Sequence, residues 1–302
     1  MPPRVVAIVL NWNSAGDTID CVAALARQPY PSCATLVVDN GSSDDSLHRI
    51  RAALPSLPVL ALNDNLGYAG GNNRGIERAL RDGADYIWLL NPDTVVAPDA
   101  LAALIEAAEV RPRAGLLGPK VYTREDPGRI LSAGGMLEDE CVAVLRGLGE
   151  ADTGQFDAVA EVDYVSGCAV LARRDAIEAI GMLDERFFLY HEEVDWCRRA
   201  RAAGFSVLYV PAARVWHPDT RVRDELSPLV TYYIARNTLQ FARKHRVGGA
   251  AMARLIGRYA RTLVSWSVRP RWRHKRRQRD ALALALFDFA AGRLGRAPHR
   301  LG

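Results

Sequence analysis

The sequence lacks features that mark several classes of protein. No uninterrupted apolar run approaches about 18 residues, so a membrane-spanning helix is not expected, and the apolar run at 5–10 is too short for a signal peptide. The five cysteines are widely spaced, odd in number and without a CxxC pair, which indicates reduced thiols in the core. We therefore expect a cytoplasmic protein.

Acidic residues are also scarce at the C-terminal end. After residue 240 the chain has 16 lysines and arginines but only two acids, a net charge of +14, whereas the first 240 residues carry 23 basic and 33 acidic residues, a net charge of −10. Arginines and tryptophans mix on helical patterns between 266 and 279, which favours docking on an anionic membrane surface. A solvated helix face and nucleic-acid binding are the alternatives, and the acidic front part argues against nucleic acid.

Strand and helix patterns alternate along the first 120 residues, which predicts a doubly wound, mostly parallel α/β sheet. The patterns predict strands at 5–10, 35–38, 59–62 and 86–90, and helices at 18–27, 44–53, 72–81 and 98–109. The less regular middle section has strand-like pieces at 142–145 and 162–171. Beyond it, a helix is expected at 192–203, a strand at 206–210 that stops at Pro211, and helices at 229–245, 250–267 and 276–291.

Polar side chains follow three of the predicted strands. Leu10-Asn11-Trp12 ends the first, Asp39-Asn40 ends the second, and Asn91-Pro92-Asp93 follows the apolar strand at 86–90. In open α/β sheets, ligands collect beyond the carboxyl ends of the strands. An aromatic ring there can stack on a base, and a carboxylate can accept from a ring N–H or a ribose hydroxyl. The alternative is ordinary turn chemistry, common for Asp beside Pro.

Two further segments carry candidate chemistry. The glycine-rich junction at 63–73 would let backbone N–H groups approach an anionic ligand at a helix start. The glycines after the first two strands do not form the GxGxxG pattern, so a dinucleotide site is not favoured. The cluster His191-Glu192-Glu193-Val194-Asp195 places three acids at a helix start, where they favour the helix dipole. Their repulsion is expected to raise at least one pKa, as a general base requires, and Asp195 is expected to pair with Arg198 or Arg199.

Taken together, these motifs resemble family 2 glycosyltransferases, above all their rhamnosyltransferase-like branch. The resemblance covers about residues 5–245 and is carried by VLNWNS (9–14), VVDNGSSDDS (37–46), NLGYAGGNNRGI (65–76), WLLNPDTVV (88–96), the segment 166–205, VWHPDT (215–220) and YYIARNTLQFARKH (232–245). It implies a GT-A fold in residues 1–226, with a nucleotide-sugar-binding half (1–120) and an acceptor half (121–226), followed by a basic helical extension (227–302).

The resemblance also implies an activity. The chain would be an inverting glycosyltransferase that moves a sugar, rhamnose being one candidate, from a dTDP- or UDP-linked donor to a glycan or lipid-linked acceptor. A divalent metal, Mg²⁺ or Mn²⁺, would assist, and the protein would associate peripherally with the inner face of the cell membrane. A catalytically inactive nucleotide-sugar-binding module and a sugar nucleotidyltransferase are the alternatives. A nucleotidyltransferase would require a loop with Arg or Lys after the first strand, and residues 10–16 contain neither.

Residue roles follow from the same resemblance. Glu193 would be the general base, with Glu192 beside it, and Asp93 and His217 would bind the metal, unless His217 is simply a hydrogen-bonded loop histidine. Two motifs depart from the family pattern, because Asn91 replaces the first Asp of Asp-x-Asp and Glu193 replaces the usual second Asp of Glu-Asp. The implied donor-binding residues are Leu10, Asn11, Trp12, Asp39, Asn40, Gly70, Asn73, Asn91 and Asp93.

Overall fold

The computed structural model describes residues 1–219 and 226–298, and its contacts divide the chain into two compact units. The first unit contains residues 1–136, 145–184 and 193–219. The second contains residues 137–144, 185–192 and the described residues beyond 219. The boundary passes between Glu192 and Glu193. The functional subdivision at residue 226 stays a prediction.

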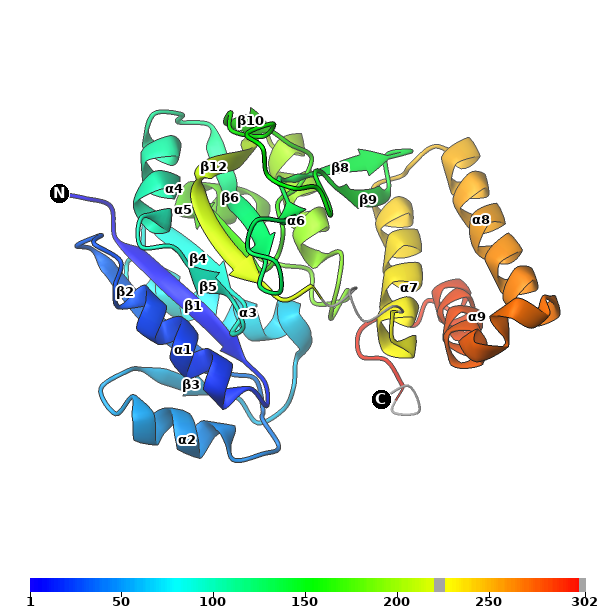
Figure 1. Ribbon diagram of the computed structural model, residues 1–302, viewed down its shortest axis with the longest axis horizontal. Coiled ribbons are helices and arrows are strands. Elements are labelled where there is room, and N and C mark those ends of the chain that lie inside the picture. Colours follow the sequence, from blue (N-terminus) through cyan, green and yellow to red (C-terminus); the bar gives the residue numbers. More distant parts are fainter. Residues whose placement is uncertain (220–225, 299–302) are drawn as a thin grey trace. The chain divides into compact units, whose positions relative to one another are not determined.

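The first unit is built on a mixed, mostly parallel sheet (Figure 1). Among the described residues, its main strands lie in the order β10-β12-β6-β11-β4-β1-β2-β3, with β5 beside β12 and β7 beside β6. The central strand β1 is parallel to β2 and β4, whereas β11 is antiparallel to β4 and β6. The bounds are β1 Val5–Asn11, β2 Cys33–Asp39, β3 Val59–Ala61, β4 Tyr86–Leu90, β5 Val95–Val96, β6 Ala114–Thr123, β7 Ile130–Ser132, β10 Ala160–Glu161, β11 Ala169–Arg173 and β12 Ser206–His217.

Helices complete the α/β architecture, and the expected fold class is confirmed. A separate two-stranded sheet pairs β8 (Gly135–Glu138) with β9 (Val142–Leu145). Helices α7, α8 and α9 and the short 3₁₀ helix η1 belong to the second unit. The bounds are α1 Ala15–Leu25, α2 Ser46–Ala53, α3 Gly67–Arg81, α4 Ala100–Glu109, α5 Arg174–Ile180, α6 Glu192–Ala202, α7 Pro228–Lys244, α8 Gly249–Val268, η1 Pro270–Lys275 and α9 Arg276–Ala290.

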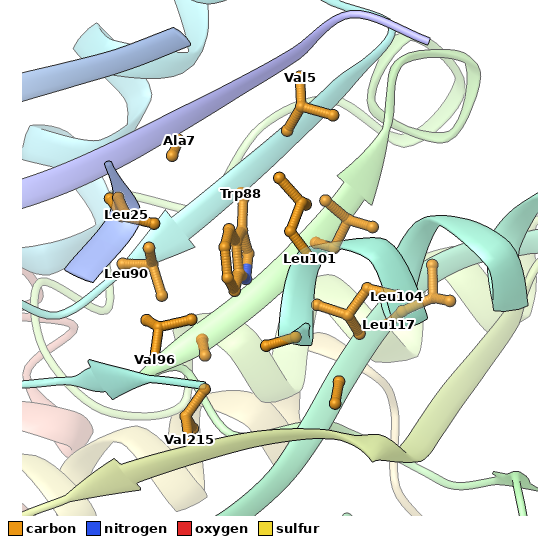
Figure 2. Close-up of a cluster of buried hydrophobic side chains, with 14 of the residues drawn as sticks. Val5, Ala7, Leu25, Trp88, Leu90, Val96, Leu101, Leu104, Leu117 and Val215 are labelled. Carbon is orange, nitrogen blue, oxygen red and sulfur yellow. The ribbon is translucent and has the colours of Figure 1, made fainter. Parts of the chain in front are cut away.

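The core of the first unit forms on both faces of the sheet. Trp88 of β4 is fully buried among Leu90, Leu101 and Leu117 (Figure 2). On the opposite face α3 packs so closely that a Cβ on Gly75 would lie 2.8 Å from Ile8. Because every residue of β1 and β4 is buried, these strands read as continuous apolar runs, as buried parallel strands do. This core fixes the strand ends from which the polar loops project.

Several expected element boundaries were wrong, three of them by five residues or more. Helix α3 begins at Gly67 rather than at 72, because its glycines allow close packing, and a Cβ on Gly71 would lie 2.6 Å from Leu10 Cδ1. Strand β12 continues past Pro211 to His217, because an irregularity in its pairing between Val210 and Arg214 accommodates the proline. The expected strand at 162–171 forms only from Ala169 onward.

The described helices include none that is long and apolar enough to cross a membrane. All five cysteines are free thiols, as expected, and four of them are buried. In the second unit, Tyr232 and Tyr233 of α7 are buried in one cluster with Ala281 and Leu282 of α9. The C-terminal helices therefore have a hydrophobic core of their own.

His191, also in the second unit, provides a test of this packing. Burial lowers the pKa of His191 from 6.5 to about 4. Below pH 6.5 the unfolded chain binds a proton that the folded chain excludes, so the free energy of unfolding falls as the pH drops from 6.5 towards 4. Asparagine tolerates the left-handed backbone at this position. Between pH 7 and pH 5, the free energy of unfolding of His191→Asn should therefore fall by about 2 kcal/mol less than that of the unmodified chain. Urea denaturation at both pH values measures it.

The matched control is His48→Asn, since His48 is exposed. This control should lose as much stability between the two pH values as the unmodified chain. If His191→Asn lost as much stability between the two pH values as the unmodified chain, the assignment of the acid sensitivity to His191 would be contradicted.

Candidate active site

Asp39 is the centre of a hydrogen-bond network at the end of β2 and is 2% exposed. Its Oδ1 accepts from Asn11 Nδ2 at 2.7 Å and from Ser42 Oγ at 2.6 Å, and its Oδ2 accepts from the Ser42 backbone N–H at 3.3 Å. The register of the parallel strands places Asn11 opposite Asp39. A carboxylate has about four acceptor sites, so Asp39 retains capacity for a ligand donor.

Trp12 follows Asn11 of this network in the chain and is 52% exposed. Its loop is fastened to the loop after β2, because the Asn13 backbone N–H donates to Ser42 Oγ at 3.0 Å and Asn13 Oδ1 accepts from the Ser43 N–H at 2.8 Å. Asn13 has a left-handed φ of 53°, which asparagine tolerates better than most residues. An exposed indole on a fastened loop can stack on a flat ring.

Asn40 positions the start of α3. Its Oδ1 accepts from the Leu66 N–H at 3.0 Å and its Nδ2 donates to the Gly67 carbonyl at 3.0 Å. Leu10 packs beneath this helix, and Gly70 is its buried fourth residue. The backbone N–H groups at 67–69, just before Gly70, have no partner within the helix. The strand ends and this helix start therefore gather at one edge of the sheet.

Asn73 is tied to a different segment of the chain. Its Nδ2 donates to the Leu183 carbonyl at 2.9 Å, and its Oδ1 accepts from the Leu183 N–H at 3.0 Å. This two-way bond joins residues 110 positions apart and is buried. Asn73 therefore anchors the segment that leads towards α6, and its expected role in shaping a donor pocket stays a prediction.

Asn91 and Asp93, which follow β4, lie together with His217, the last residue of β12. His217 Nε2 is 3.1 Å from Asn91 Nδ2 and 3.1 Å from Asp93 Oδ1. The other ring nitrogen, Nδ1, is 2.8 Å from the Pro218 carbonyl, which can only accept, so Nδ1 carries the hydrogen. In the neutral ring, Nε2 therefore has a lone pair that faces both partners.

The residues present fit a bound cation. Asp93 Oδ1 is buried, and when the His217 ring is neutral no donor among the described residues makes a hydrogen bond to it. Burial raises the pKa of Asp93, but a hydrogen bond and positive charge from the His217 ring in its protonated form, together with Arg124, lower it by more, so the carboxylate remains charged near neutrality. The described part of the chain has no group of three His, Cys, Asp or Glu that could hold a metal. Asp93 and His217 would thus be two ligands among several, as Mg²⁺ and Mn²⁺ sites allow.

The turn at 166–168 lies beside both Asp93 and Glu193. The Cys168 carbonyl accepts from the Asn91 backbone N–H at 3.0 Å. A Cβ on Gly167 would lie 3.5 Å from Glu193 Cγ. Burial and the charges of Asp93 and Glu193 raise the pKa of the Cys168 thiol to about 12. The predicted metal ligand and the predicted base are therefore neighbours of one turn.

The three acids of the 191–195 cluster differ in their surroundings. Glu192 is 4% exposed, whereas Glu193 is partly exposed. Asp195 is fully buried and accepts from Arg199 Nε at 2.9 Å, which confirms the predicted pairing at helical spacing. Of these three, Glu193 alone is both partly exposed and beside the turn at 166–168.

A buried pair on α7 holds the loop that precedes Glu192. Asn237 Nδ2 donates to the carbonyls of Phe187, Leu189 and Tyr190 at 2.8–2.9 Å. Arg236, which is fully buried, also donates to the Phe187 carbonyl, at 3.2 Å. Within this loop Phe188, Tyr190 and His191 have left-handed backbone conformations, with φ between 66° and 76°. The hydrogen bonds from Arg236 and Asn237 therefore maintain a strained backbone.

Sequence reasoning missed several residues at the site. Tyr68 donates its hydroxyl to the Gly167 carbonyl at 2.5 Å, and Arg124 Nη1 is 3.4 Å from the Asp93 carbonyl. The glycine-rich junction drew attention to small residues, but its single aromatic residue was the available signal for Tyr68. No comparable signal marks Arg124, one of many arginines in the chain.

The chain matches known glycosyltransferases. The model of the family described as "Glycosyltransferase like family 2" matches residues 2–231. An N-acetylglucosaminyl-diphospho-decaprenol L-rhamnosyltransferase of Mycobacterium tuberculosis is 30% identical over 256 residues, which cover 76% of this chain and 81% of the relative. A dTDP-rhamnosyl transferase of Shigella flexneri is 24% identical, with 82% of each chain covered.

Solved structures agree in fold. A mannosyltransferase from Pyrobaculum calidifontis, in complex with GDP-Man and Mn²⁺, has a TM-score of 0.61 at 16% identity and covers 96% of this chain and 88% of its own. TarS of S. aureus has a TM-score of 0.57 at 18% identity and covers 95% and 80%. These likenesses show a GT-A-like fold. Together with the family match, they establish that this chain belongs to the family 2 glycosyltransferases.

Proposed function

We propose that this protein is an inverting glycosyltransferase that moves rhamnose from a dTDP- or UDP-linked donor to a lipid-linked or glycan acceptor. Family membership and two rhamnosyltransferase relatives support the reaction class and the sugar. One relative acts on a diphospho-decaprenol acceptor by its name, which supports the lipid-linked alternative. The observation that carries the proposal is the turn at 166–168, because Asp93 and Glu193 both lie beside it.

In the proposed reaction, Glu193 is the general base. An acceptor hydroxyl oxygen attacks the anomeric carbon while its proton passes to the Glu193 carboxylate. The bond from that carbon to the diphosphate breaks, and the nucleoside diphosphate leaves with the electron pair. Attack from the face opposite the leaving group inverts the anomeric centre. Trp12 stacks on the base and Asp39 accepts from the base or the ribose.

A divalent cation would be held by Asp93 Oδ1 and His217 Nε2. When bound, it would neutralise the negative charge that develops on the departing diphosphate. The Pro218 carbonyl keeps the hydrogen of His217 on Nδ1, so Nε2 faces Asp93 with its lone pair. Asn91 replaces a charged residue here, and its Nδ2 lies 3.1 Å from His217 Nε2, a contact that a bound cation would replace because Nε2 has a single lone pair.

Helix α8 suits peripheral membrane association. Its exposed apolar side chains Ile256, Val264 and Val268 fall within a stripe of roughly 120° at 100° per residue. Basic residues follow in η1, where Arg271 and Lys275 lie over the Trp272 ring. Apolar and Arg/Trp-rich segments of this kind favour the interface of anionic bilayers. We therefore infer that the protein works at the inner face of the cell membrane.

Replacing the base tests the mechanism. Glu193→Gln should lower kcat by roughly 10² to 10⁴ while nucleotide affinity stays within about twofold, because only proton transfer is lost. Steady-state transfer assays and calorimetry with the nucleoside diphosphate measure the two quantities. The matched control Glu192→Gln changes the buried neighbour. Unchanged turnover in Glu193→Gln would remove Glu193 from the mechanism, and absent turnover in the unmodified chain, despite donor binding, would indicate an inactive binding module.

Replacing Asp93 tests the cation site. Mn²⁺ should tighten donor binding to the unmodified chain, and Asp93→Asn should reduce that gain at least tenfold, because a charged ligand becomes neutral. Calorimetric titrations with and without Mn²⁺ measure the gain. Asp17→Asn is the control, since Asp17 lies 3.6 Å from Arg124 in the same region but does not contact His217. An equal gain in Asp93→Asn would exclude Asp93 as a ligand.

Charged substitutions in the apolar stripe of α8 test membrane association. Val264→Asp with Val268→Asp should reduce binding to vesicles rich in phosphatidylglycerol at least tenfold, because two exposed apolar side chains become charged. Co-sedimentation with vesicles measures the bound fraction. Val110→Asp is the control, because Val110 is 67% exposed but lies in the first unit. Equal sedimentation of the double variant would refute docking through α8.

A further inference from the structure

The second unit contains an apolar cavity that the donor chemistry does not use. Its volume is about 280 Å³, and its walls come from β9 and from helices α7, α8 and α9. Ligand pockets begin at about 300 Å³, so this cavity accommodates a small apolar body or part of a long chain. The apolar walls are formed by Val142, Ile234, Ala235, Tyr259, Trp266 and Leu282.

A second cavity of about 320 Å³ adjoins the first and is cationic. Arg258 and Val142 line both cavities, so Arg258 stands where the apolar space meets the charged space. Arg254 and Arg261 line the cationic cavity beside Arg258 on one face of α8. Asp139 is its only acid and pairs with Arg254 at 2.8 Å. Among the described residues, neither Arg258 nor Arg261 forms an ion pair, and the cavity has a net charge of +2.

We propose that the two cavities together bind a polyprenyl diphosphate, the lipid carrier of the acceptor sugar. The first isoprene units occupy the apolar cavity and the diphosphate lies on Arg258 and Arg261. A diphosphate diester carries two negative charges, which match the net charge of the cationic cavity, whereas phosphatidylglycerol carries one. Arginine also presents paired donors that suit phosphate oxygens. The proposal rests on the proposed transfer to a lipid-linked acceptor and names its carrier.

The position of His191 in the chain supports this use of the cavity. His191 lines the apolar cavity, and a single residue separates it from Glu193. Its ring is fixed there, with Nε2 3.0 Å from Thr238 Oγ1 of α7. The hydrogen bonds from Asn237 hold the residues just before His191. His191 therefore contributes to the cavity wall from the part of the sequence that immediately precedes the candidate base.

Binding of farnesyl diphosphate to the full chain, without donor or metal, tests the proposal. Calorimetry should detect saturable binding, and Arg258→Ala should weaken it at least tenfold because a charged contact is lost. Ala143→Phe, which fills the cavity from β9, should weaken it similarly. Arg273→Ala, an exposed residue of η1 outside both cavities, is the charge control and should bind as the unmodified chain does. Trp266 fluorescence should change on binding and remain constant in Ala143→Phe.

Two comparisons separate the possible outcomes. Farnesol and inorganic pyrophosphate should each bind at least tenfold more weakly than farnesyl diphosphate, and phosphatidylglycerol vesicles should not displace it. Displacement by the vesicles, or equal binding to Arg258→Ala, would overturn the proposal. Nucleoside diphosphate binding and thermal unfolding, measured on the same variants, keep this result separate from the proposed function. Lost lipid binding with intact nucleotide binding overturns the carrier site alone, whereas a chain that binds lipid but no nucleotide overturns the transferase.

Discussion

The turn at 166–168 is the constraint on which the candidate site depends. The Cys168 carbonyl accepts from the Asn91 N–H and from Thr94 Oγ1 at 3.2 Å, which uses both of its lone pairs and fixes the segment that carries Asp93. The Gly167 carbonyl accepts from Tyr68. The high pKa of the Cys168 thiol keeps this side chain uncharged between two acids. A short, neutral turn whose Gly167 and Cys168 carbonyls are both hydrogen-bonded is thus what allows two carboxylates to approach one space.

A second polar network, in the other unit, maintains strain. Left-handed backbone at a non-glycine residue costs of order 1–3 kcal/mol, and Phe188, Tyr190 and His191 all adopt it. Arg236 brings a buried charge, whose desolvation is unfavourable unless its donors are bonded. Its guanidinium donates to the Tyr232 hydroxyl and to backbone carbonyls, so the buried charge and the strained loop stabilise each other. The segment before Glu192 is therefore preorganised.

The sequence predicted what depends on local pattern and strand order. Parallel strands place their carboxyl ends at one edge, so Asp39 and Asp93 could be assigned to the site before any coordinates. Contacts between distant segments could not be predicted, because no periodicity encodes which side chain meets which carbonyl. The bond between Asn73 and Leu183 and the one from Tyr68 to Gly167 are of this kind. The early start of α3 was missed because packing outweighed the low helix propensity of glycine.

The part of the chain that matches the family model and the C-terminal helices differ in the chemistry that we propose for them. The family match ends at residue 231, inside α7, so α8 and α9 lie beyond the part that this chain shares with the family model. Donor chemistry is common to such enzymes, since each must stabilise a departing diphosphate, whereas acceptors differ in size and polarity. The +14 charge and the apolar stripe of α8 both fall in the C-terminal part. The acceptor and membrane recognition that we propose for these helices can therefore change without disturbing the hydrogen bonds that hold Asp93 and Asp39.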